Sequence, residues 1–532
     1  MANLSPIISA PRRNWQRHWQ KLLCATRLYN CRLQADIPEY LRFMPRHPWP
    51  GAISQGQALL VDELTLNGKT YALSPADWPS GENIGAVALN EWHRFGFLRD
   101  LHAHGGQAAR NLARDSIKNW LKSYPRWHTQ FWQPEMTADR VVAWLTHFAF
   151  FGASADDGFR QEFFKSLSRQ LRHIELSLAQ ENHLLPRLKM IKALLHAALS
   201  LPESYINIEA VLADAKDILA SLVLADGSCR GLNPSLQLTA LQDCLEMRHV
   251  LISANCAVPE ELSKSIALLG RALRAMRHGD GGLTLLRGAY EERAEFIDLL
   301  LQFANAKGRA PDFLPFAGLQ RITAQRSLLL VDESETSTQP LAFEFSHGKE
   351  RLIVSCGNGE SISANWANAT KLAAASSTLE IIGAAPLRSD TSLRIDSQRQ
   401  TVDGNHLFEA SHNGYEAEGF IKHQRRWYLN GDGDDLRGED KLEGQGMREI
   451  ALRFHLHPKV QATLTANSVL LKLPSQLGWR FKAQGGEIVL EDSVYLGSRG
   501  LMRRTQQIVL YAPVRGQGLS LQWALQREGK KE

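Results

Sequence analysis

The sequence predicts a multidomain α+β protein, with an α-helical domain first and an antiparallel β-sandwich second. Three observations lead to this fold class. The 532 residues are more than one ordinary core accommodates, so at least two domains are expected. Apolar residues recur at every third or fourth position between about residues 90 and 305, which is the spacing of amphipathic helices. After about residue 320 the apolar period changes to two, which is the spacing of β-strands.

The helical half contains three segments with a clear apolar stripe, at residues 159–178, 208–222 and 262–276. Short runs with helix-breaking residues separate the stripes: "LPES" (201–204), "ADGSCRGLNP" (225–234) and "RHGDGG" (277–282). Many helices with short turns and no strands between them predict paired antiparallel helices.

The β half is a series of short alternating runs. In "IALRFHLH" every second residue from Ile450 to Leu456 is apolar, so these residues are expected to share one face of a strand. Arg453, His455 and His457 are expected on the opposite face. Similar runs follow one another with turns such as "SHGK", "GNGE" and "NGDGDD" between them, which is typical of a sandwich of many strands.

The first ninety residues have little periodicity and are rich in Trp and Pro. We interpret residues 1–90 as an irregular or helical segment that packs on the helices. Residues 91–315 are then the α-helical domain, and residues 316–532 are the β-sandwich domain.

Composition narrows the range of functions. The net charge of +5 is compatible with an acidic ligand and is far below that of a dedicated nucleic-acid binder. No apolar run is long enough to span a membrane. The N-terminus lacks the continuous apolar core of a signal peptide. The six cysteines are scattered without a CxxC pair, so neither a zinc site nor a disulfide framework is indicated.

A set of phrases is spread in order over most of the chain: "FGFLRDLHAHGGQAAR" (95–110), "ADGSCRGLNPSLQL" (225–238), "MRHGDGGL" (276–283), "LAFEFSHGKERLIVSCG" (341–357), "ASHNGY" (410–415), "KHQRRWYL" (422–429), "LRGEDKL" (436–442), "LRFHLHPKV" (452–460), "EDSVYLG" (491–497) and "RRTQQIVL" (503–510). With these phrases the chain resembles the heparinase II/III family, and more closely its bacterial members of alphaproteobacterial type. Each phrase is weak alone, and together they are specific. The resemblance implies an incomplete (α/α) toroid followed by an antiparallel β-sandwich.

The resemblance also implies a carbon–oxygen lyase that cleaves a uronic-acid polysaccharide, such as a glycosaminoglycan, by β-elimination. A base removes the proton beside the uronate carboxyl group, an acid protonates the leaving oxygen, and a hydrogen-bond donor stabilises the developing negative charge. In "QENHLLPRLKMIKALL" the resemblance makes Asn182 the group that neutralises the carboxylate and His183 its neighbour. A polar helix start after a loop explains the same pair.

Two positions depart from the pattern of the active relatives. Leu236 in "RGLNPSLQL" stands where they have a catalytic Tyr, and Ser376 in "LAAASSTLEI" stands where they have a His. Losing a positioned acid or base removes roughly 10²- to 10⁴-fold in rate, so these two residues place the activity in doubt.

The remaining cluster of titratable side chains lies in "HNGY" and "HQRRWYL". We predict catalytic roles for His412, Tyr415 and His423, with Tyr415 as base or acid. Arg425 and Arg426 are predicted to bind a uronate or sulfate group through paired N–H donors. Cross-strand pairs on a half-exposed sheet explain the same residues without a site.

Arg453 and His455 share a strand face with His457 and would extend the substrate-binding site. The two histidines have the spacing of metal ligands on a strand, but no third ligand is identifiable, so no metal site is predicted. No cofactor is expected from the sequence, although the resemblance leaves a structural zinc or calcium open. The acidic run "GDGDDLRGEDKL" lacks the spacing of an EF-hand and is predicted to be a solvated hairpin turn.

The leading interpretation is a lyase that acts on an acidic polysaccharide at the junction of the two domains. The alternative is a weakened or inactive member of the fold that binds a glycan in envelope or capsular polysaccharide metabolism. A scaffold partner in polysaccharide assembly is the third. The resemblance implies the cell envelope or periplasm as location, and without a clear signal peptide the cytoplasm is the alternative.

Overall fold

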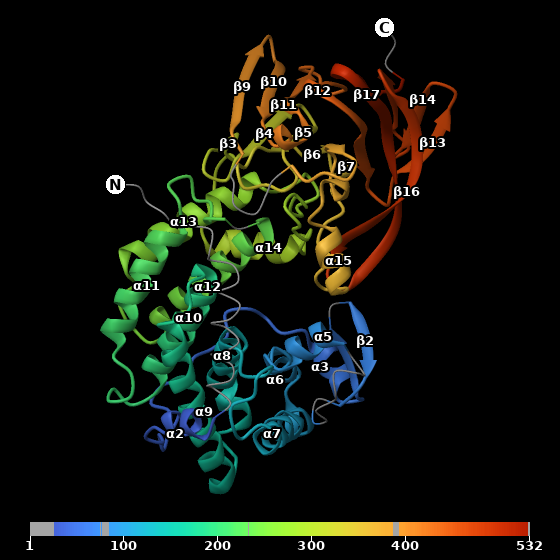
Figure 1. Cartoon of the computed structure of the whole chain (residues 1–532). Helices are drawn as coiled ribbons and strands as arrows, with labels where there is room; N and C mark the ends of the chain where they lie inside the picture. Colours follow the sequence, from blue (N-terminus) through green and yellow to red (C-terminus); the bar gives the residue numbers. More distant parts are fainter. Residues whose placement is uncertain are drawn as a thin grey trace, which may run out of the picture. The chain divides into compact units, whose positions relative to one another are not determined.

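The chain forms two compact units (Figure 1). The computed structural model describes residues 26–66, 68–74, 76, 85–231, 233–386 and 393–529. The helical unit comprises Met1–Leu222 and Gln242–Ile266, and the sandwich unit comprises Val223–Leu241 and Ala267–Glu532. These bounds differ from the boundary expected after residue 315, because residues 267–315 group with the strands. Residues 1–25, which belong to the segment 1–90, lie outside the described residues.

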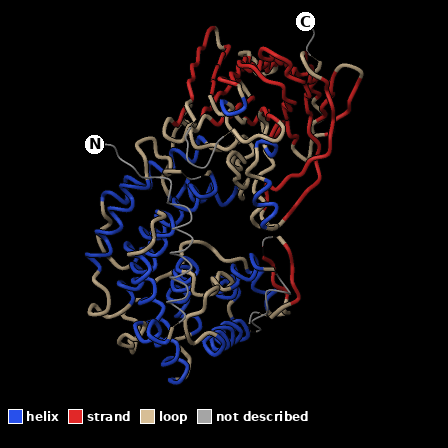
Figure 2. The backbone as a smooth tube through the Cα atoms, viewed as in Figure 1, coloured by secondary structure: helices blue, strands red, loops and turns tan. Residues whose placement is uncertain are grey.

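Helices make up most of the helical unit (Figure 2). They are α2 (Arg27–Arg32), α3 (Ile53–Leu59), α5 (Ala86–Trp92), α6 (Leu98–His104), α7 (Gly106–Ser123), α8 (Pro134–Phe151), α9 (Asp157–Leu178), α10 (Leu184–Ser200) and α11 (Ile208–Leu222). Helices α12 (Pro234–Ser253) and α13 (Glu260–Ala275) each contribute to both units. The three apolar stripes coincide with α9, α11 and α13, so the helical periodicity is confirmed.

Two kinds of helix alternate in this unit. Helices α8 and α10 are buried on nearly all sides, whereas α9 and α11 are buried along one stripe only. Helix α10 packs against α8, α9 and α11. Inner and outer helices in alternation form an incomplete (α/α) toroid, as the resemblance implied. Within the described residues, no helix has both the length and the apolar character that a membrane span requires.

Local signals place the helix ends. Pro134 lies in the first turn of α8, where its missing N–H costs no hydrogen bond. Asp156 caps α9, because its carboxylate accepts the backbone N–H of Phe159 at 2.8 Å. In the segment expected to be irregular or helical, β1 (Glu63–Leu66) and β2 (Lys69–Ala72) form a hairpin that the sequence did not predict.

The sandwich unit contains a fifteen-stranded antiparallel sheet within the described residues. Its strands are β3 (Phe313–Leu314), β4 (Leu319–Ala324), β5 (Ser327–Asp332), β6 (Phe343–His347), β7 (Glu350–Val354), β8 (Leu379–Ile381), β9 (Ile395–Val402), β10 (Asn405–His412), β11 (Phe420–Leu429), β12 (Asp435–Leu456), β13 (Gln461–Thr465), β14 (Ser468–Lys472), β15 (Gly478–Gln484), β16 (Glu487–Ser498) and β17 (Leu501–Arg527). Helices α14 (Ala294–Phe303) and α15 (Ala364–Ala369) precede β3 and β8.

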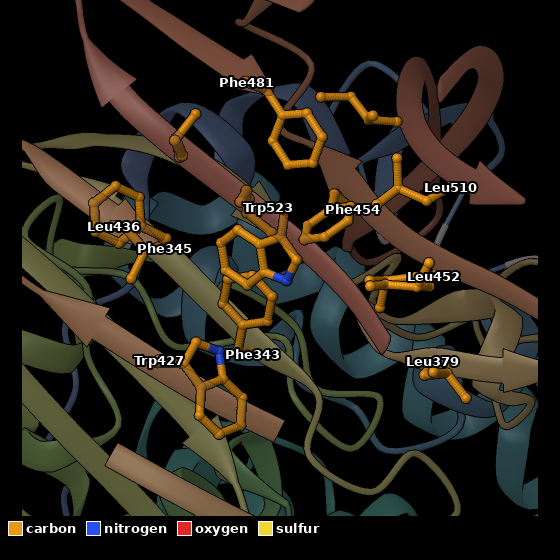
Figure 3. Packing of buried hydrophobic residues seen from close by; sticks show 14 of the residues in the cluster. Phe343, Phe345, Leu379, Trp427, Leu436, Leu452, Phe454, Phe481, Leu510 and Trp523 are labelled. Atoms are coloured by element: carbon orange, nitrogen blue, oxygen red, sulfur yellow. The ribbon is translucent and has the colours of Figure 1, made fainter. Parts of the chain in front are cut away.

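The sheet folds over on itself around an aromatic core (Figure 3). Phe343 on β6 stacks on Trp523 of β17, with ring centroids 5.5 Å apart, although the two strands are not paired. Phe454 on β12 meets the same indole edge to face at 5.0 Å. Packing between unpaired strands is what a β-sandwich requires, and the predicted fold class is confirmed for this half.

Strand β12 follows the predicted alternation, but both of its faces are covered. Leu452 and Phe454 are fully buried on the first face. His455 lies on the opposite face, as predicted, and is only 2% exposed. Its Nε2 is 3.0 Å from the backbone oxygen of Ala374, which belongs to the segment that covers this face. The acidic turn is confirmed at residues 430–434, whereas Asp440 of the same run is buried within β12.

Candidate functional site

A pocket of about 250 Å³ lies in the sandwich unit beside Leu236. Most of its described lining is glycine, hydroxyl or amide side chains. The side chain of Leu236 is 39% exposed at the start of α12. Asn233 fixes this helix start, because its side-chain oxygen accepts the backbone N–H of Leu236 at 3.0 Å.

The second departure from the family pattern meets the first at this pocket. Ser376 is fully buried, and its hydroxyl donates to the side-chain oxygen of Gln339 at 2.7 Å. Gln339 lines the pocket together with Leu236. Leu236 therefore lines the pocket directly, whereas Ser376 is connected to it only through the hydrogen bond to Gln339. Among the described residues that line it, there is neither a tyrosine nor a histidine.

The pocket has one cation available for a ligand. Arg287 lines it, but its guanidinium is paired with the buried carboxylate of Asp332 at 2.7 Å. Lys371 also lines it, is exposed, and has no carboxylate partner within the described residues. Glu360 is the exposed anion of the lining. Nothing in the sequence around Lys371 or Gln339 indicated a site, since both lie in irregular segments.

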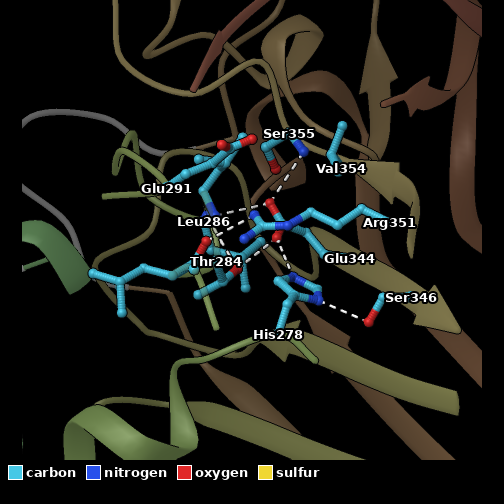
Figure 4. Close-up of polar contacts among 12 residues, drawn as sticks. His278, Thr284, Leu286, Glu291, Glu344, Ser346, Arg351, Val354 and Ser355 are labelled. Carbon is cyan, nitrogen blue, oxygen red and sulfur yellow. Dashed lines mark hydrogen bonds and ion pairs between the residues drawn. The ribbon is translucent and has the colours of Figure 1, made fainter. Parts of the chain in front are cut away.

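A buried carboxylate anchors the segment that precedes Arg287 and Gly288, two residues of the pocket wall (Figure 4). Glu344 on β6 accepts the backbone N–H of Leu285 at 3.0 Å and the hydroxyl of Thr284 at 2.8 Å. His278 lies 2.8 Å from the same carboxylate, and burial lowers the pKa of its imidazole. Each of these groups is buried and hydrogen-bonded, so the wall is tied to the sheet.

His412 and His423 lie side by side on the paired strands β10 and β11. The backbone N–H of Gly414 donates to Nδ1 of His412 at 3.0 Å, so the proton of His412 is on Nε2. Nε2 of His412 donates to Nδ1 of His423 at 2.9 Å, and Nε2 of His423 donates to Asp440 at 3.0 Å. Both histidines are at most 2% exposed, and burial followed by the charge of His423 lowers the pKa of His412. The hydrogen bonds from His412 through His423 to Asp440 all lie within the core. This arrangement does not favour direct contact of the two histidines with a polysaccharide.

Tyr415 is part of the same core. It is 1% exposed, and its hydroxyl donates to the backbone oxygen of Leu379 at 2.9 Å. Burial raises the pKa of the phenol, which disfavours the phenolate that a base requires.

Tyr415→Phe separates a structural role from a site role. Loss of the hydroxyl leaves the oxygen of Leu379 without this donor, so the free energy of unfolding is expected to fall by about 1–2 kcal/mol. Glycan binding is expected to be unchanged. Chemical denaturation of the variant measures the free energy of unfolding, and calorimetric titration with glycan measures the binding. Loss of binding at unchanged stability would show that Tyr415 is part of the binding site.

Arg425 and Arg426 point to opposite sides of β11. Arg425 is fully buried, and its guanidinium lies 4.7 Å from the ring centre of Phe343 and 3.2 Å from Asp440. Burial lowers its pKa. Arg426 is 49% exposed at its side chain and pairs with Glu409 at 2.5 Å, so of the two it alone faces solvent.

None of the remaining predicted residues is among the lining residues of the pocket beside Leu236. Arg453 is 13% exposed at its side chain and pairs with Glu380 at 2.9 Å. His455 has a pKa lowered to about 4 by burial. Asn182 and His183 are exposed in the loop before α10, in the helical unit, as the alternative interpretation of a polar helix start after a loop expects. The described residues contain no group of three or more His, Cys, Asp or Glu that could hold a metal ion.

The helical unit has a pocket of its own, of about 400 Å³, that the sequence interpretation missed. Lys192 of α10 is buried there and donates to Asp243 and Glu246 of α12, at 2.6 Å each. Trp49 donates to Glu246 at 2.6 Å. The available signal was Lys192 in the apolar stretch "MIKALL" of α10, where a buried lysine requires a partner.

The comparisons with known proteins agree with this architecture. Residues 306–524 match the family described as heparinase II/III-like, C-terminal. FtsZ-localized protein C of Caulobacter vibrioides (strain NA1000 / CB15N) is 29% identical, over 92% of this chain and 90% of that protein.

Two solved structures share the fold over nearly the whole chain. The crystal structure of heparinase III has a TM-score of 0.73 at 12% identity and covers 97% of this chain and 91% of that chain. A mutant of the heparan sulfate lyase HepC from Pedobacter heparinus has a TM-score of 0.62 at 15% identity and covers 95% and 88%. Residues 306–524 therefore form a heparinase II/III-like C-terminal domain, and the chain as a whole shares its fold with heparinase III and HepC.

Proposed function

We propose that this chain binds an acidic polysaccharide without cleaving it by β-elimination. The observation that carries the proposal is the pocket beside Leu236. The two positions that depart from the active pattern, 236 and 376, meet there through Gln339, and no tyrosine or histidine is in the described lining. The likeness to heparinase III and HepC supports a polysaccharide as the ligand class.

The described lining lacks the tyrosine and the histidine that the resemblance implies for proton transfer. β-Elimination needs a base for the proton beside the carboxyl group and an acid for the leaving oxygen, and each positioned group contributes roughly 10²- to 10⁴-fold. The other titratable candidates, His412, Tyr415 and His423, are buried with their polar atoms bonded inside the sandwich. What remains in the pocket is suited to binding, because hydroxyl and amide groups pair with sugar hydroxyls and Lys371 attracts a carboxylate.

The proposal predicts binding without product. Across heparin-like, chondroitin-like, alginate-like and bacterial capsular polymers, we expect no rise in the ultraviolet absorbance of unsaturated uronate. We expect measurable binding to at least one of them. Lys371→Ala removes the available cation and is expected to weaken this binding about threefold to tenfold. The control is Lys472→Ala, an exposed lysine of β14 outside the pocket lining, which is expected to bind as the wild type does.

An absorbance rise with the wild-type chain would contradict the proposal and favour an active lyase. Equal affinity of the Lys371→Ala and wild-type chains would move the glycan site away from this pocket. Leu236→Tyr restores the expected phenol at an exposed position, so a gain of product with this variant alone would support the pocket as the site of lost chemistry.

A second candidate function follows from the match to FtsZ-localized protein C, which extends over 92% of this chain. We propose that this chain also localises with FtsZ. A fluorescent fusion of the chain is expected to coincide with labelled FtsZ, and a uniform distribution would contradict it. Fractionation of the same cells distinguishes the envelope location implied by the family from the cytoplasmic one.

A further inference from the structure

A second pocket of the sandwich unit, of about 570 Å³, has a lining dominated by arginine. It lies where the end of α13, the loop after it and strand β4 come together. Its charged lining residues are Arg274, Arg277, Arg309, Arg321 and Asp312, and we call it the arginine pocket.

The guanidinium group of Arg321 on β4 has hydrogen-bond donors without an acceptor in the described residues. Its Nη1 donates to the backbone oxygens of Ala275 at 3.1 Å and Arg277 at 2.7 Å. For its Nε and Nη2 the described residues provide no acceptor. Burial is the main cause that lowers the pKa of Arg321 to about 10; the charge of Asp312 acts to raise it, and those of Arg274, Arg277 and Arg309 act to lower it.

Arg274 also lacks a carboxylate within the described residues. Its Nη1 donates to the backbone oxygen of Ala306 at 2.7 Å, and its Nη2 contacts that of Gly308. Its Nε is buried without a hydrogen-bond partner. Neutral backbone oxygens therefore orient both Arg274 and Arg321 and leave their positive charges in place.

The other two arginines are neutralised. Arg277 pairs with Asp298 at 2.7 Å, and Arg309 pairs with Asp312 at 3.0 Å. The arginine pocket therefore holds two positive charges more than the described acidic groups balance. Burying uncompensated charge is costly, so this arrangement fits a site that an anion completes.

Glycine keeps the guanidinium groups accessible. Gly279 and Gly281 line the pocket. A Cβ at Gly281 would lie 2.9 Å from Nη2 of Arg277, and Gly281 has a positive φ of 89°. A side chain at this position would displace the arginine.

We propose that the arginine pocket binds a phosphate-type dianion, either inorganic phosphate or the phosphate group of a phosphorylated sugar. A dianion matches the excess of two positive charges, whereas a carboxylate neutralises only one. Guanidinium groups that are already oriented bind phosphate oxygens through paired N–H donors without further ordering. This ligand is distinct from the acidic polysaccharide proposed above, and neither proposal depends on the other.

Calorimetric titration of the full chain with inorganic phosphate, at constant ionic strength and slightly alkaline pH, tests the pocket. The wild type is expected to bind phosphate, sulfate is expected to compete because it has the same charge and shape, and acetate is expected to bind at least tenfold more weakly. Arg321→Gln removes a charged donor and is expected to weaken phosphate binding about tenfold or more.

Exposed positions supply variants that do not disturb the fold. The side chain of Arg309 is 80% exposed, so Arg309→Glu is expected to fold and, by reversing a charge in the lining, to weaken phosphate binding about tenfold. The matched control is Arg394→Glu, whose side chain is 79% exposed outside the lining, and it is expected to bind phosphate as the wild type does.

The proposal is overturned if the wild type binds phosphate no better than acetate, or if Arg309→Glu and Arg394→Glu bind it equally. A sugar phosphate is titrated in parallel. Tighter binding of the sugar phosphate than of inorganic phosphate identifies a phosphorylated sugar as the ligand, and equal binding identifies the free ion.

Discussion

Asp440→Ala is expected to lower the free energy of unfolding of the sandwich unit by about 3–5 kcal/mol, because it leaves buried donors without their acceptor. The carboxylate of Asp440 is 3.0 Å from His423, 3.1 Å from the indole nitrogen of Trp523 and 3.2 Å from the guanidinium of Arg425. All of these groups are buried, so water does not replace the lost acceptor. The positive charge of Arg425 is then buried without a counter-ion.

The neighbouring residue is a matched control. Glu439 is on the same strand, is 28% exposed at its side chain, and pairs with the half-exposed Arg426. Glu439→Ala is therefore expected to cost at most about 1 kcal/mol. Urea unfolding of both variants measures the difference, and equal stability would show that the chain from His412 to Asp440 is not a core network.

Stability is expected to fall steeply as the pH drops below about 6.5, because several histidines are buried in the neutral form. Burial lowers the pKa of His173, His196 and His455 to about 4 from the ordinary 6.5. Between these values the unfolded chain binds protons that the folded chain does not. Stability from this source is complete above pH 6.5 and is lost as the pH falls, by about 1.4 kcal/mol for each histidine and pH unit.

The free energy of unfolding at pH 7.5 and at pH 5.5 checks this expectation. His455→Gln is expected to reduce the pH dependence of the stability of the sandwich unit.

Acidic residues with lowered pKa values contribute to the pH dependence of stability in a separate, lower pH range. Asp280 has a pKa of about 2, held down against burial by Arg351, so its contribution is lost only below about pH 4. Stability that stays constant or rises between pH 7.5 and 5.5 would contradict the prediction.

The fold was predictable because each apolar period holds over single helices or strands and recurs along its half of the chain. The stripes from Phe159, Ile208 and Leu262 each span a whole helix, and the alternation from Ile450 continues through β12. The hairpin of β1 and β2 was missed because it is only two short strands in a segment without periodicity. Residues 223–241 and 267–315 group with strands that follow much later in the chain, and no local pattern indicates this grouping.

The candidate site was less predictable, because period two does not tell whether the second face of a strand is covered. His412, His423 and Arg425 have the side chains of an active site, and tertiary packing makes them a satisfied core network. Conversely, Lys371 and Gln339 carry no pattern of their own. Only folding brings them to the pocket beside Leu236.

The central claim is that the chain holds an acidic glycan and leaves its bonds intact. Mass spectrometry of an acidic oligosaccharide, recovered after prolonged incubation with the wild-type chain, tests it most directly. The oligosaccharide is expected to be bound to the protein at the end of the incubation. After its release it is expected to have its original mass. Two fragments whose masses add up to that of the intact ligand, one of them carrying an unsaturated uronate, would contradict it.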